Sequence, residues 1–321
     1  MSDSATVFAK VLVLENDAAS LGRIKAFCDS SNLLPLTARF DSFVATLQEN
    51  VDLAGIFLSE STGDSEFDFL AIGELVSRIR PELPVFLRCA DPAARTLSPE
   101  SEGYFACRYS LDSLDGLRLV VAERIFSFSY PAVLVSGLID MAKTALESQF
   151  IGMDVVTEEP YVVLDKHIMG EIFTLVPIET GWCRGYMMLQ VDETELANLV
   201  NNHRTHVRAA HAEDFRNLNG VVNELTNLLW GSFKNRYLQL NMTSQNLSQV
   251  PLVINPNHHH ISFGANNPQL CFKHNLSSAD GTASITVFQK FVFNLSWNPE
   301  DFYQNDVVAE AQESAGELEF F

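Results

Sequence analysis

Apolar residues in the first part of the chain come in short continuous runs that alternate with stretches of helical periodicity. The apolar runs lie at residues 10–16, 52–60, 83–90 and 103–109. Apolar residues at helical spacing occupy 17–31, 69–80 and 111–126. Strands that are apolar on both faces, with helices between them, are typical of a parallel sheet covered on both sides. Residues 1–127 are therefore predicted to form an α/β domain with a parallel sheet.

The pattern changes over residues 128–134, which we interpret as a linker. Pro131 lies within it, and the fixed backbone angle of proline suits the first turn of a helix. Beyond the linker, helical patterns occupy 134–150, 192–202 and 218–237. Strand patterns occupy 161–165, 171–178, 183–191, 251–255, 269–275 and 283–297. Because strands and helices are segregated here rather than alternating, residues 135–298 are predicted to form an α+β domain.

The charge of the chain excludes several classes of partner. The 321 residues carry a formal net charge of −20. Nucleic acids and anionic membrane surfaces are bound through clustered Lys and Arg, so neither is an expected partner. Residues 299–321 contain seven acidic residues and no Lys or Arg. This last segment is predicted to be a disordered acidic tail.

The sequence also indicates a cytoplasmic protein. The opening residues, MSDSATVFAK, have neither the basic nor the apolar region of a signal peptide. No uninterrupted apolar run approaches the roughly 18 residues of a membrane span. The five cysteines are scattered without a C-x-x-C pair, which favours reduced thiols in the cytoplasm.

The longest helical pattern presents two different faces. One face is apolar and is predicted to contact the core; it consists of Leu218, Val221, Val222, Leu225, Leu228, Leu229 and Phe233. The opposite face carries Gly220, Glu224, Asn227, Gly231 and Lys234 at alternating spacings of four and three. Glycine in a helix interior costs about 0.8–1 kcal/mol relative to alanine. Two glycines beside a carboxylate and a carboxamide indicate a flat surface for close approach of another protein, which we call the docking strip.

Residues 8–126 resemble a response-regulator receiver domain in length and in the order of strands. The resemblance rests on VLVLENDAA, PVFLRCA and YFACRYSLDSL, which look like the first, fourth and fifth strands of that family. The positions that carry receiver chemistry fall here on Glu15, Asn16, Phe57, Cys89 and Cys107. Phosphorylation of a receiver needs a carboxylate nucleophile, acidic Mg²⁺ ligands and a lysine.

Almost all of these positions depart from the family pattern. The lysine position falls on Cys107 and the switch hydroxyl on Cys89, and a strict count puts Phe57 where the phosphorylated aspartate belongs. A shift in the loop offers Ser59 or Glu60 at that position instead. The resemblance therefore implies a degenerate receiver that takes up no phosphate. The alternative is a doubly wound domain with no receiver ancestry.

The second domain resembles the CheC/CheX/FliY family of chemotaxis phosphatases. The resemblance rests on MAKTALESQFIGMDV, on GVVNELTNLLWGSFKN with its E-x-x-N pattern, and on VPLVI with Pro251. In that family the Glu and Asn act on the aspartyl phosphate of a receiver protein. The resemblance implies that Glu224 pairs with a lysine of the partner and that Asn227 orients the attacking water. It implies no cofactor in this chain, since Mg²⁺ belongs to the partner's site.

Three departures bear on this resemblance. Gly220 stands where the family usually has Asp or Ser, and the spacing from Asn227 to Pro251 is about one residue long. In the first helix, Glu147 is followed by Phe150 at the Asn position, so no second site is expected there. One site rather than two is the pattern of the CheX type, which also implies a homodimer through sheet edges.

Two functions remain open from the sequence. The first is dephosphorylation of a phosphorylated receiver partner by Glu224 and Asn227. The second is a non-catalytic scaffold or adaptor in a chemotaxis or motility complex, because E-x-x-N on an exposed helix face is common. Catalysis predicts that both side chains point outward on an accessible face. An adaptor predicts that the face is covered.

Other candidate chemistry in the sequence is weaker. Adjacent histidines in NPNHHHISF alternate sides on a strand and cannot all face one ion. His203, His206 and His211 have no Cys or carboxylate that completes a metal-binding set. No metal site is therefore expected. Nucleophile-elbow, Walker and G-x-G-x-x-G motifs are absent from the sequence.

Overall fold

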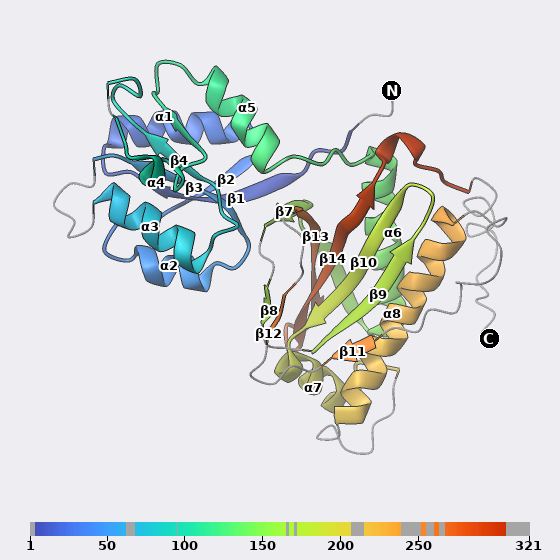
Figure 1. Ribbon diagram of the computed structural model, residues 1–321. Helices are drawn as coiled ribbons and strands as arrows, with labels where there is room; N and C mark the ends of the chain where they lie inside the picture. Colours follow the sequence, from blue (N-terminus) through green and yellow to red (C-terminus); the bar gives the residue numbers. More distant parts are fainter. Residues whose placement is uncertain are drawn as a thin grey trace.

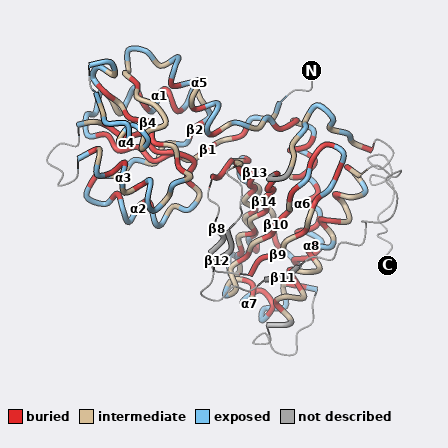
Figure 2. The backbone as a smooth tube through the Cα atoms, in the orientation of Figure 1, coloured by how far each residue is buried: buried red, intermediate tan, exposed pale blue. Residues whose placement is uncertain are grey.

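The computed structural model shows two lobes joined side by side (Figure 1). It describes residues 4–61, 68–94, 96–164, 167–169, 172–206, 215–238, 252–254, 260–262 and 267–305. Buried residues are concentrated along the strands of both lobes, so each lobe has its core against its own part of the sheet (Figure 2).

The N-terminal lobe contains a five-stranded parallel sheet. Its strands are β1 (Phe8–Leu14), β2 (Leu33–Thr37), β3 (Leu53–Ser59), β4 (Val85–Arg88) and β5 (Cys107–Tyr109). Parallel pairing gives the order β2-β1-β3-β4-β5. This order defines the flavodoxin-like class of doubly wound sheets, in which ligands bind beyond the carboxyl ends of the strands. The apolar runs in the sequence predict this alternating, parallel arrangement.

Helices cover both faces of this sheet. They are α1 (Ala18–Asp29), α2 (Phe43–Glu49), α3 (Phe69–Ile79), α4 (Pro99–Glu102) and α5 (Asp115–Arg124). In Figure 1, α1 and α5 lie on one face and α2 and α3 on the other. All seven residues of β3 are buried as a result. Asp17 and Asp68 cap α1 and α3 by accepting backbone N–H bonds from Ser20 and Ala71.

The second lobe is built on a mostly antiparallel sheet. Its strands are β6 (Met153–Thr157), β7 (Tyr161–Val163), β9 (Ile172–Glu179), β10 (Cys183–Val191), β11 (Leu252–Ile254), β13 (Gln269–Ser278) and β14 (Ser284–Trp297). The order is β11-β9-β10-β14-β13, and β6 and β7 lie in succession along the outer side of β13. Two further short strands, β8 (His167–Met169) and β12 (His260–Ser262), pair with each other.

Two long helices pack on this sheet and on each other. They are α6 (Ala132–Gln149) and α8 (Phe215–Tyr237), with the shorter α7 (Glu193–Asn201) near one end of the sheet (Figure 1). Close approach of the two helices depends on Gly137. A Cβ atom at this position would come within 2.1 Å of the Tyr237 hydroxyl. Strands and helices are thus segregated in this lobe, with the long helices packed on one sheet.

The two lobes share one continuous sheet. Strand β7 pairs antiparallel with β13 and parallel with β1, through Phe8–Tyr161 and Ala9–Val162. Ala9 also pairs with Leu33 of β2. Therefore β7 must lie on the opposite side of β1 from β2, where it continues the line of β3. Sequence periodicity gives no sign of this pairing, because it joins strands about 150 residues apart.

The predicted linker is held in place by contacts on both sides. The backbone N–H of Ala5 donates to the Tyr130 carbonyl (2.8 Å). The indole N–H of Trp297 donates to the Ser129 carbonyl (3.2 Å), and the Trp297 ring stacks on Phe128. Residues before β1 and residues before α6 thus run together from one lobe to the other (Figure 1). The segment that connects the two lobes therefore packs against the N-terminal residues on one side and against Trp297 on the other.

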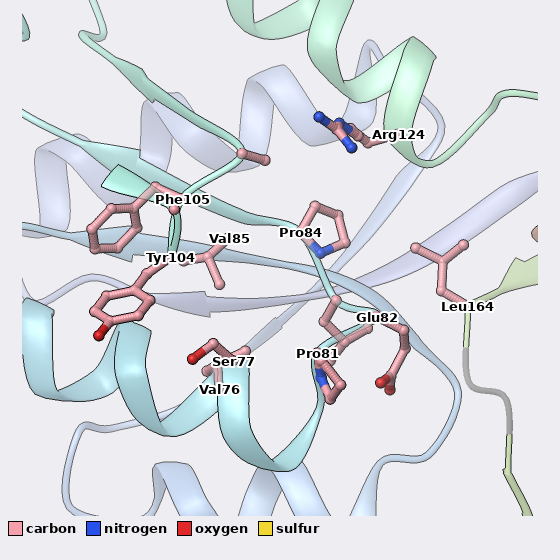
Figure 3. A pocket seen from close by; sticks show the side chains of 13 residues that line it. Val76, Ser77, Pro81, Glu82, Pro84, Val85, Tyr104, Phe105, Arg124 and Leu164 are labelled. Carbon is pink, nitrogen blue, oxygen red and sulfur yellow. The ribbon is translucent and has the colours of Figure 1, made fainter. Parts of the chain in front are cut away.

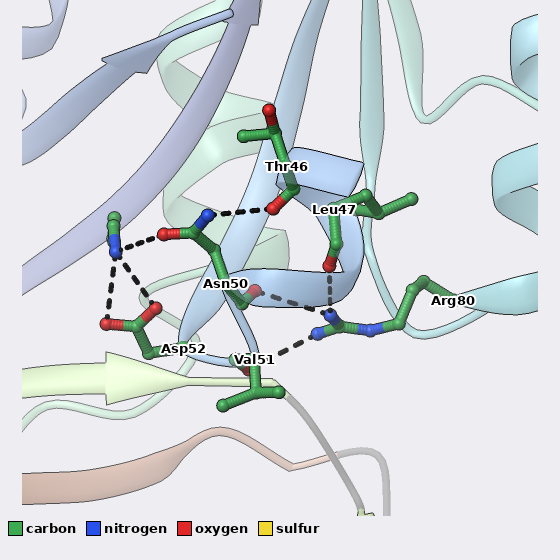
Figure 4. A network of polar contacts seen from close by, with 7 residues as sticks. Thr46, Leu47, Asn50, Val51, Asp52 and Arg80 are labelled. Carbon is green, nitrogen blue, oxygen red and sulfur yellow. Dashed lines mark hydrogen bonds and ion pairs between the residues drawn. The ribbon is translucent and has the colours of Figure 1, made fainter. Parts of the chain in front are cut away.

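A polar network fixes the turn before β3, close to the junction. Lys10 on β1 donates to the Asn50 side chain (2.7 Å) and pairs with Asp52 (3.1 Å), while Arg80 donates to three main-chain carbonyls (Figure 4). Those carbonyls belong to Leu47, Asn50 and Val51. Main-chain oxygens that would otherwise be left without donors are thereby satisfied.

The prediction of a disordered tail from residue 299 is wrong for residues 299–305. Phe302 packs edge-on against Trp182, with 5.1 Å between ring centroids. The Asn305 side chain donates to the carbonyls of Asn235 (2.9 Å) and Leu238 (2.7 Å) at the end of α8. The acidic composition of the segment gives no sign of these two contacts. The Asn305 contact satisfies carbonyls at the end of a helix, and the Phe302 contact packs one aromatic ring against another. Residues 306–321 lie outside the described residues.

Candidate functional site

The apolar face of α8 packs on the core and sets the direction of its other face. Leu218, Val221, Val222, Leu225, Leu229 and Phe233 are buried as the periodicity predicts. Leu228 is only half-buried, because it lies at the margin of the apolar stripe. With this side fixed against β9 and α6, the docking strip must face away from the core.

The docking strip is open in the described part of the chain. Asn227 is exposed and Glu224 is half-buried, and neither side chain forms a hydrogen bond or ion pair with the described residues. A Cβ atom added at Gly220 or at Gly231 would meet no atom of another segment within 4 Å. The surface between the two glycines therefore carries a carboxylate and a carboxamide with little to obstruct a partner.

The C-terminal end of the docking strip carries a positive charge. Lys234 lies over the Trp230 ring, with its Nζ atom 5.9 Å from the ring centroid. This cation–π contact holds a positive charge at the C-terminal end of the strip, where the helix dipole favours it. In Figure 1, α8 lies on the side of its lobe remote from the N-terminal lobe, so the described elements of the N-terminal lobe do not cover this helix.

Glu147 and Phe150, the positions at which a second site would be sought, lie at the end of the first helix of the second lobe. Glu147 on α6 is directed to Lys143 on the next turn (3.9 Å). Phe150, at the position where a second Asn would be needed, is buried to 1% exposure. A carboxylate without a neighbouring carboxamide cannot repeat the arrangement of Glu224 and Asn227.

A buried ion pair occupies the carboxyl ends of the N-terminal strands. Glu15 follows β1, and its side chain, 1% exposed, accepts a hydrogen bond from Nε of Arg88 at the end of β4. The backbone N–H of Asp17 donates to the same carboxylate (2.9 Å). Arg88 Nη2 donates to the Ser59 hydroxyl at the end of β3 (2.8 Å). One guanidinium thus joins three strand ends at the position where this class of fold binds ligands.

The charge of Arg88 is held by its surroundings. Burial on its own lowers the pKa of Arg88, but the hydrogen bond and charge of Glu15 outweigh it and raise this pKa. The guanidinium therefore stays protonated beside Glu15. Because the Glu15 carboxylate is already paired with this guanidinium, a divalent cation would have to displace Arg88 to bind it. Sequence reasoning missed Arg88, although a basic residue ending an apolar strand is a usable signal.

The other receiver-like positions differ in their burial. Phe57 lies in the core, 1% exposed, with its ring 5.1 Å from that of Phe86. Phe57 thus contributes to the core, whereas Ser59, two residues further on, reaches the polar ends of the strands. Cys89 is buried to 1% exposure, and Asn16 is exposed.

Cys107 is the first residue of β5. It lines a hollow of about 200 Å³ with Leu97, Glu102, Phe105 and Arg108. Burial raises the pKa of the Cys107 thiol to about 11. A neutral thiol at this position cannot counter the charge of a phosphoryl group as a lysine would.

A larger cavity of about 460 Å³ lies at the opposite edge of the N-terminal sheet (Figure 3). Its walls come from α3, the start of β4, the end of α5, and Leu164 of the second lobe. Its acidic side chain, Glu82, is already paired with Arg80. Arg124 is exposed at the end of α5, away from any acidic partner in the described residues. The cavity therefore lacks the convergent titratable groups of an active site.

The histidines do not form a metal site in the part of the chain that the structure describes. His203 and His206 are exposed beside α7. His211, His258 and His259 lie outside the described residues, and His260 belongs to β12. Across the described ranges, no group of three or more His, Cys, Asp or Glu side chains is placed to hold a metal ion. No helix in those ranges is long and apolar enough to cross a membrane.

Comparison with known proteins yields similar structures only. No family model matches the chain, and no curated protein matches it. A CheC-like chemotactic protein from Shewanella oneidensis MR-1 is 16% identical with a TM-score of 0.33, over 49% of this chain and 94% of that chain. The chemotaxis protein CheX from Vibrio vulnificus is 18% identical with a TM-score of 0.35, over 50% of this chain and 100% of that chain.

The N-terminal lobe has similar structures of another kind. A response-regulator receiver-domain protein from Clostridium thermocellum is 16% identical with a TM-score of 0.32, over 36% of this chain and 94% of that chain. Structures similar to this chain thus include CheX and receiver-domain proteins, at low identity and over part of the chain. At these values we draw no functional inference from the likeness.

Proposed function

We propose that this chain removes phosphate from the aspartyl phosphate of a receiver-domain partner in chemotaxis or two-component signalling. The observation that supports the proposal is the open docking strip. Glu224 and Asn227 lie one helical turn apart on it, outward and without partners among the described residues, between two glycines with free space above them. The E-x-x-N pattern of the sequence is thus displayed where a second protein can reach it.

The proposed chemistry needs little from this chain beyond positioning. An acyl phosphate is already activated, and the partner's own site supplies Mg²⁺, so the remaining tasks are to dock and to orient water. Glu224 supplies a carboxylate for a lysine of the partner. Asn227 has both a donor and an acceptor, and can hold a water in line with the phosphorus. The chain itself needs no metal or other cofactor.

The test is the loss of phosphate from a panel of phosphorylated receivers. Each receiver is phosphorylated with a small phosphodonor, the donor is removed, and the decay of the phosphoryl group is followed with and without this protein and with Mg²⁺ present. We expect faster decay for at least one receiver. Tight binding with unchanged decay across the panel would support the adaptor function and would contradict catalysis.

We further propose that the N-terminal lobe is a degenerate receiver that accepts no phosphate. The Arg88–Glu15–Ser59 contacts fill the strand ends with a guanidinium–carboxylate pair and leave a serine in place of a carboxylate nucleophile. Incubation with acetyl phosphate and Mg²⁺ is expected to leave the mass of the protein unchanged. An acid-stable, base-labile phosphoryl group at one equivalent within residues 1–126 would contradict this expectation.

A substitution at Gly231 tests whether the docking strip is used. Gly231→Arg should leave the thermal unfolding temperature near that of the wild type, because the new side chain enters open space and arginine favours helix more than glycine does. The same change should weaken binding of the receiver that responds in the panel, since it places a bulky side chain on the strip. Gly22→Arg in α1, which also has free space, is the matched control. Equal binding by the two variants would show that the strip is not the docking surface.

A further inference from the structure

A pair of threonines lies directly beneath the docking strip. Thr226 lies between Glu224 and Asn227 on α8 and is fully buried. Its hydroxyl donates to the Val222 carbonyl one turn earlier (2.7 Å). The same oxygen lies 2.7 Å from the hydroxyl of Thr174 on β9, which is also fully buried. Since the Thr226 proton is used within the helix, Thr174 is the donor of the second bond.

This is a directional contact in an apolar layer. Thr174 is flanked across the sheet by Leu189 and Val253. Burial of apolar side chains stabilises a helix against a sheet but does not depend on direction, so it tolerates some rotation of the helix. A hydrogen bond weakens steeply when its angle or length departs from the preferred values. The two hydroxyls therefore fix the rotation of α8 at the level of the candidate site.

Small rotations of α8 would displace the candidate residues considerably. With 3.6 residues per turn, Asn227 points about 100° and Glu224 about 160° around the helix from Thr226. Side-chain ends lie about 5–6 Å from the helix axis, so a rotation of about 20° moves them by about 2 Å. A misplacement of about 1 Å in a reacting geometry costs on the order of 10²-fold in rate.

We propose that Thr226 and Thr174 are positioning residues, which hold α8 in the rotation that aims Asn227 at the reacting water. This inference rests on the proposed phosphatase function for its kinetic consequence. Its structural part, the fixed direction of Asn227, holds independently of any activity. Neither threonine touches the partner, because both are fully buried.

Valine and serine substitutions separate positioning from stability. Thr226→Val keeps the shape and removes the hydroxyl, whereas Thr226→Ser keeps the hydroxyl. Thr174→Val combined with Thr226→Val removes both partners and leaves no unpaired hydroxyl, so that variant should remain folded. Thr144→Val is the matched control, because Thr144 on α6 bonds the Asp140 carbonyl (2.9 Å) at an exposed position away from the docking strip.

Two measurements test the proposal. In steady-state dephosphorylation, Thr226→Val and the double variant should show kcat lowered about tenfold with KM within about twofold of wild type, and Thr226→Ser should restore kcat. By NMR, the Asn227 side-chain carboxamide signals, identified by their absence in Asn227→Ala, should shift in the two valine variants. They should stay in place in Thr226→Ser and Thr144→Val.

The outcomes distinguish this inference from the proposed function. If the wild-type protein is inactive on every receiver, the phosphatase function is contradicted. If the Asn227 carboxamide signals nevertheless shift in Thr226→Val, the positioning of Asn227 by Thr226 is supported. Carboxamide signals unchanged in the double variant would overturn the positioning role, whatever the activity. A fall in kcat that Thr226→Ser does not restore would also overturn it.

Discussion

Replacing Arg88 by methionine is expected to lower the free energy of unfolding by about 3–5 kcal/mol. The Glu15 side chain is 1% exposed, so the variant would bury a carboxylate with no counter-charge. The Ser59 hydroxyl would lose its bond to Nη2 at the same time. Methionine fills most of the vacated volume, which keeps the effect electrostatic rather than one of a cavity. Unfolding in urea, followed by circular dichroism, measures the change.

Two further variants show whether the ion pair is the cause. Glu15→Gln combined with Arg88→Met removes both charges together and should recover most of the loss, since buried pairs are often replaceable by neutral groups at little cost. Arg23→Met removes a surface partner of Asp112, whose side chain is 88% exposed, and should cost at most about 1 kcal/mol. If Arg88→Met is no more destabilising than Arg23→Met, the ion pair does not hold the strand ends together.

Asn227→Ala is expected to lower kcat on a responsive phosphorylated receiver by about 10²-fold with little change in KM. The carboxamide is proposed to align the attacking water, which matters mainly as the transition state forms. Glu224→Ala should instead raise KM, by an amount corresponding to about 1.5–3 kcal/mol, because its charge-assisted contact already exists in the ground-state complex. Steady-state kinetics with the purified receiver separates the two effects.

A matched control lies on the same helix. Asn235 is exposed on α8 but lies about 80° around the helix from Asn227. Asn235→Ala should therefore leave both kcat and KM unchanged. Wild-type kinetics in Asn227→Ala and Glu224→Ala would show that these side chains have no part in catalysis, and the adaptor function would then replace the phosphatase.

The sequence predicts features that depend on local periodicity. The apolar residues at helical spacing predict the buried face of α8, and the residues between them then define its opposite face. Leu228 is the member of the apolar stripe that is half-buried rather than buried. The positions of Glu147 and Phe150 are also local, because both lie at the end of one helix. In both cases the spacing of neighbouring residues determines which side of the helix they occupy.

Features that depend on distant strands are not accessible in this way. Arg88 meets Glu15 only because β1 and β4 end at one edge of the sheet. Counting along β3 offers Phe57 or, with a shift in the loop, Ser59 or Glu60, and the count alone does not choose between them. Residues 299–321 are predicted to be a disordered tail from their acidic composition. Composition does not show that Phe302 can pack on Trp182 or that the Asn305 side chain can donate to carbonyls at the end of α8. The Thr174–Thr226 contact joins a strand to a helix about 50 residues later, which no periodicity indicates.

The shared sheet gives the N-terminal lobe a protective role in the folding of the second. An open strand edge is a template for adding strands from other molecules, and proteins commonly shield such edges. Here the start of β1 pairs with β7, so the side of β7 turned away from β13 is closed by a strand made about 150 residues earlier on the chain. During synthesis that strand is present before its partner emerges. The second lobe thus meets a ready neighbour from its own chain, which reduces the chance of exchange between chains at this edge.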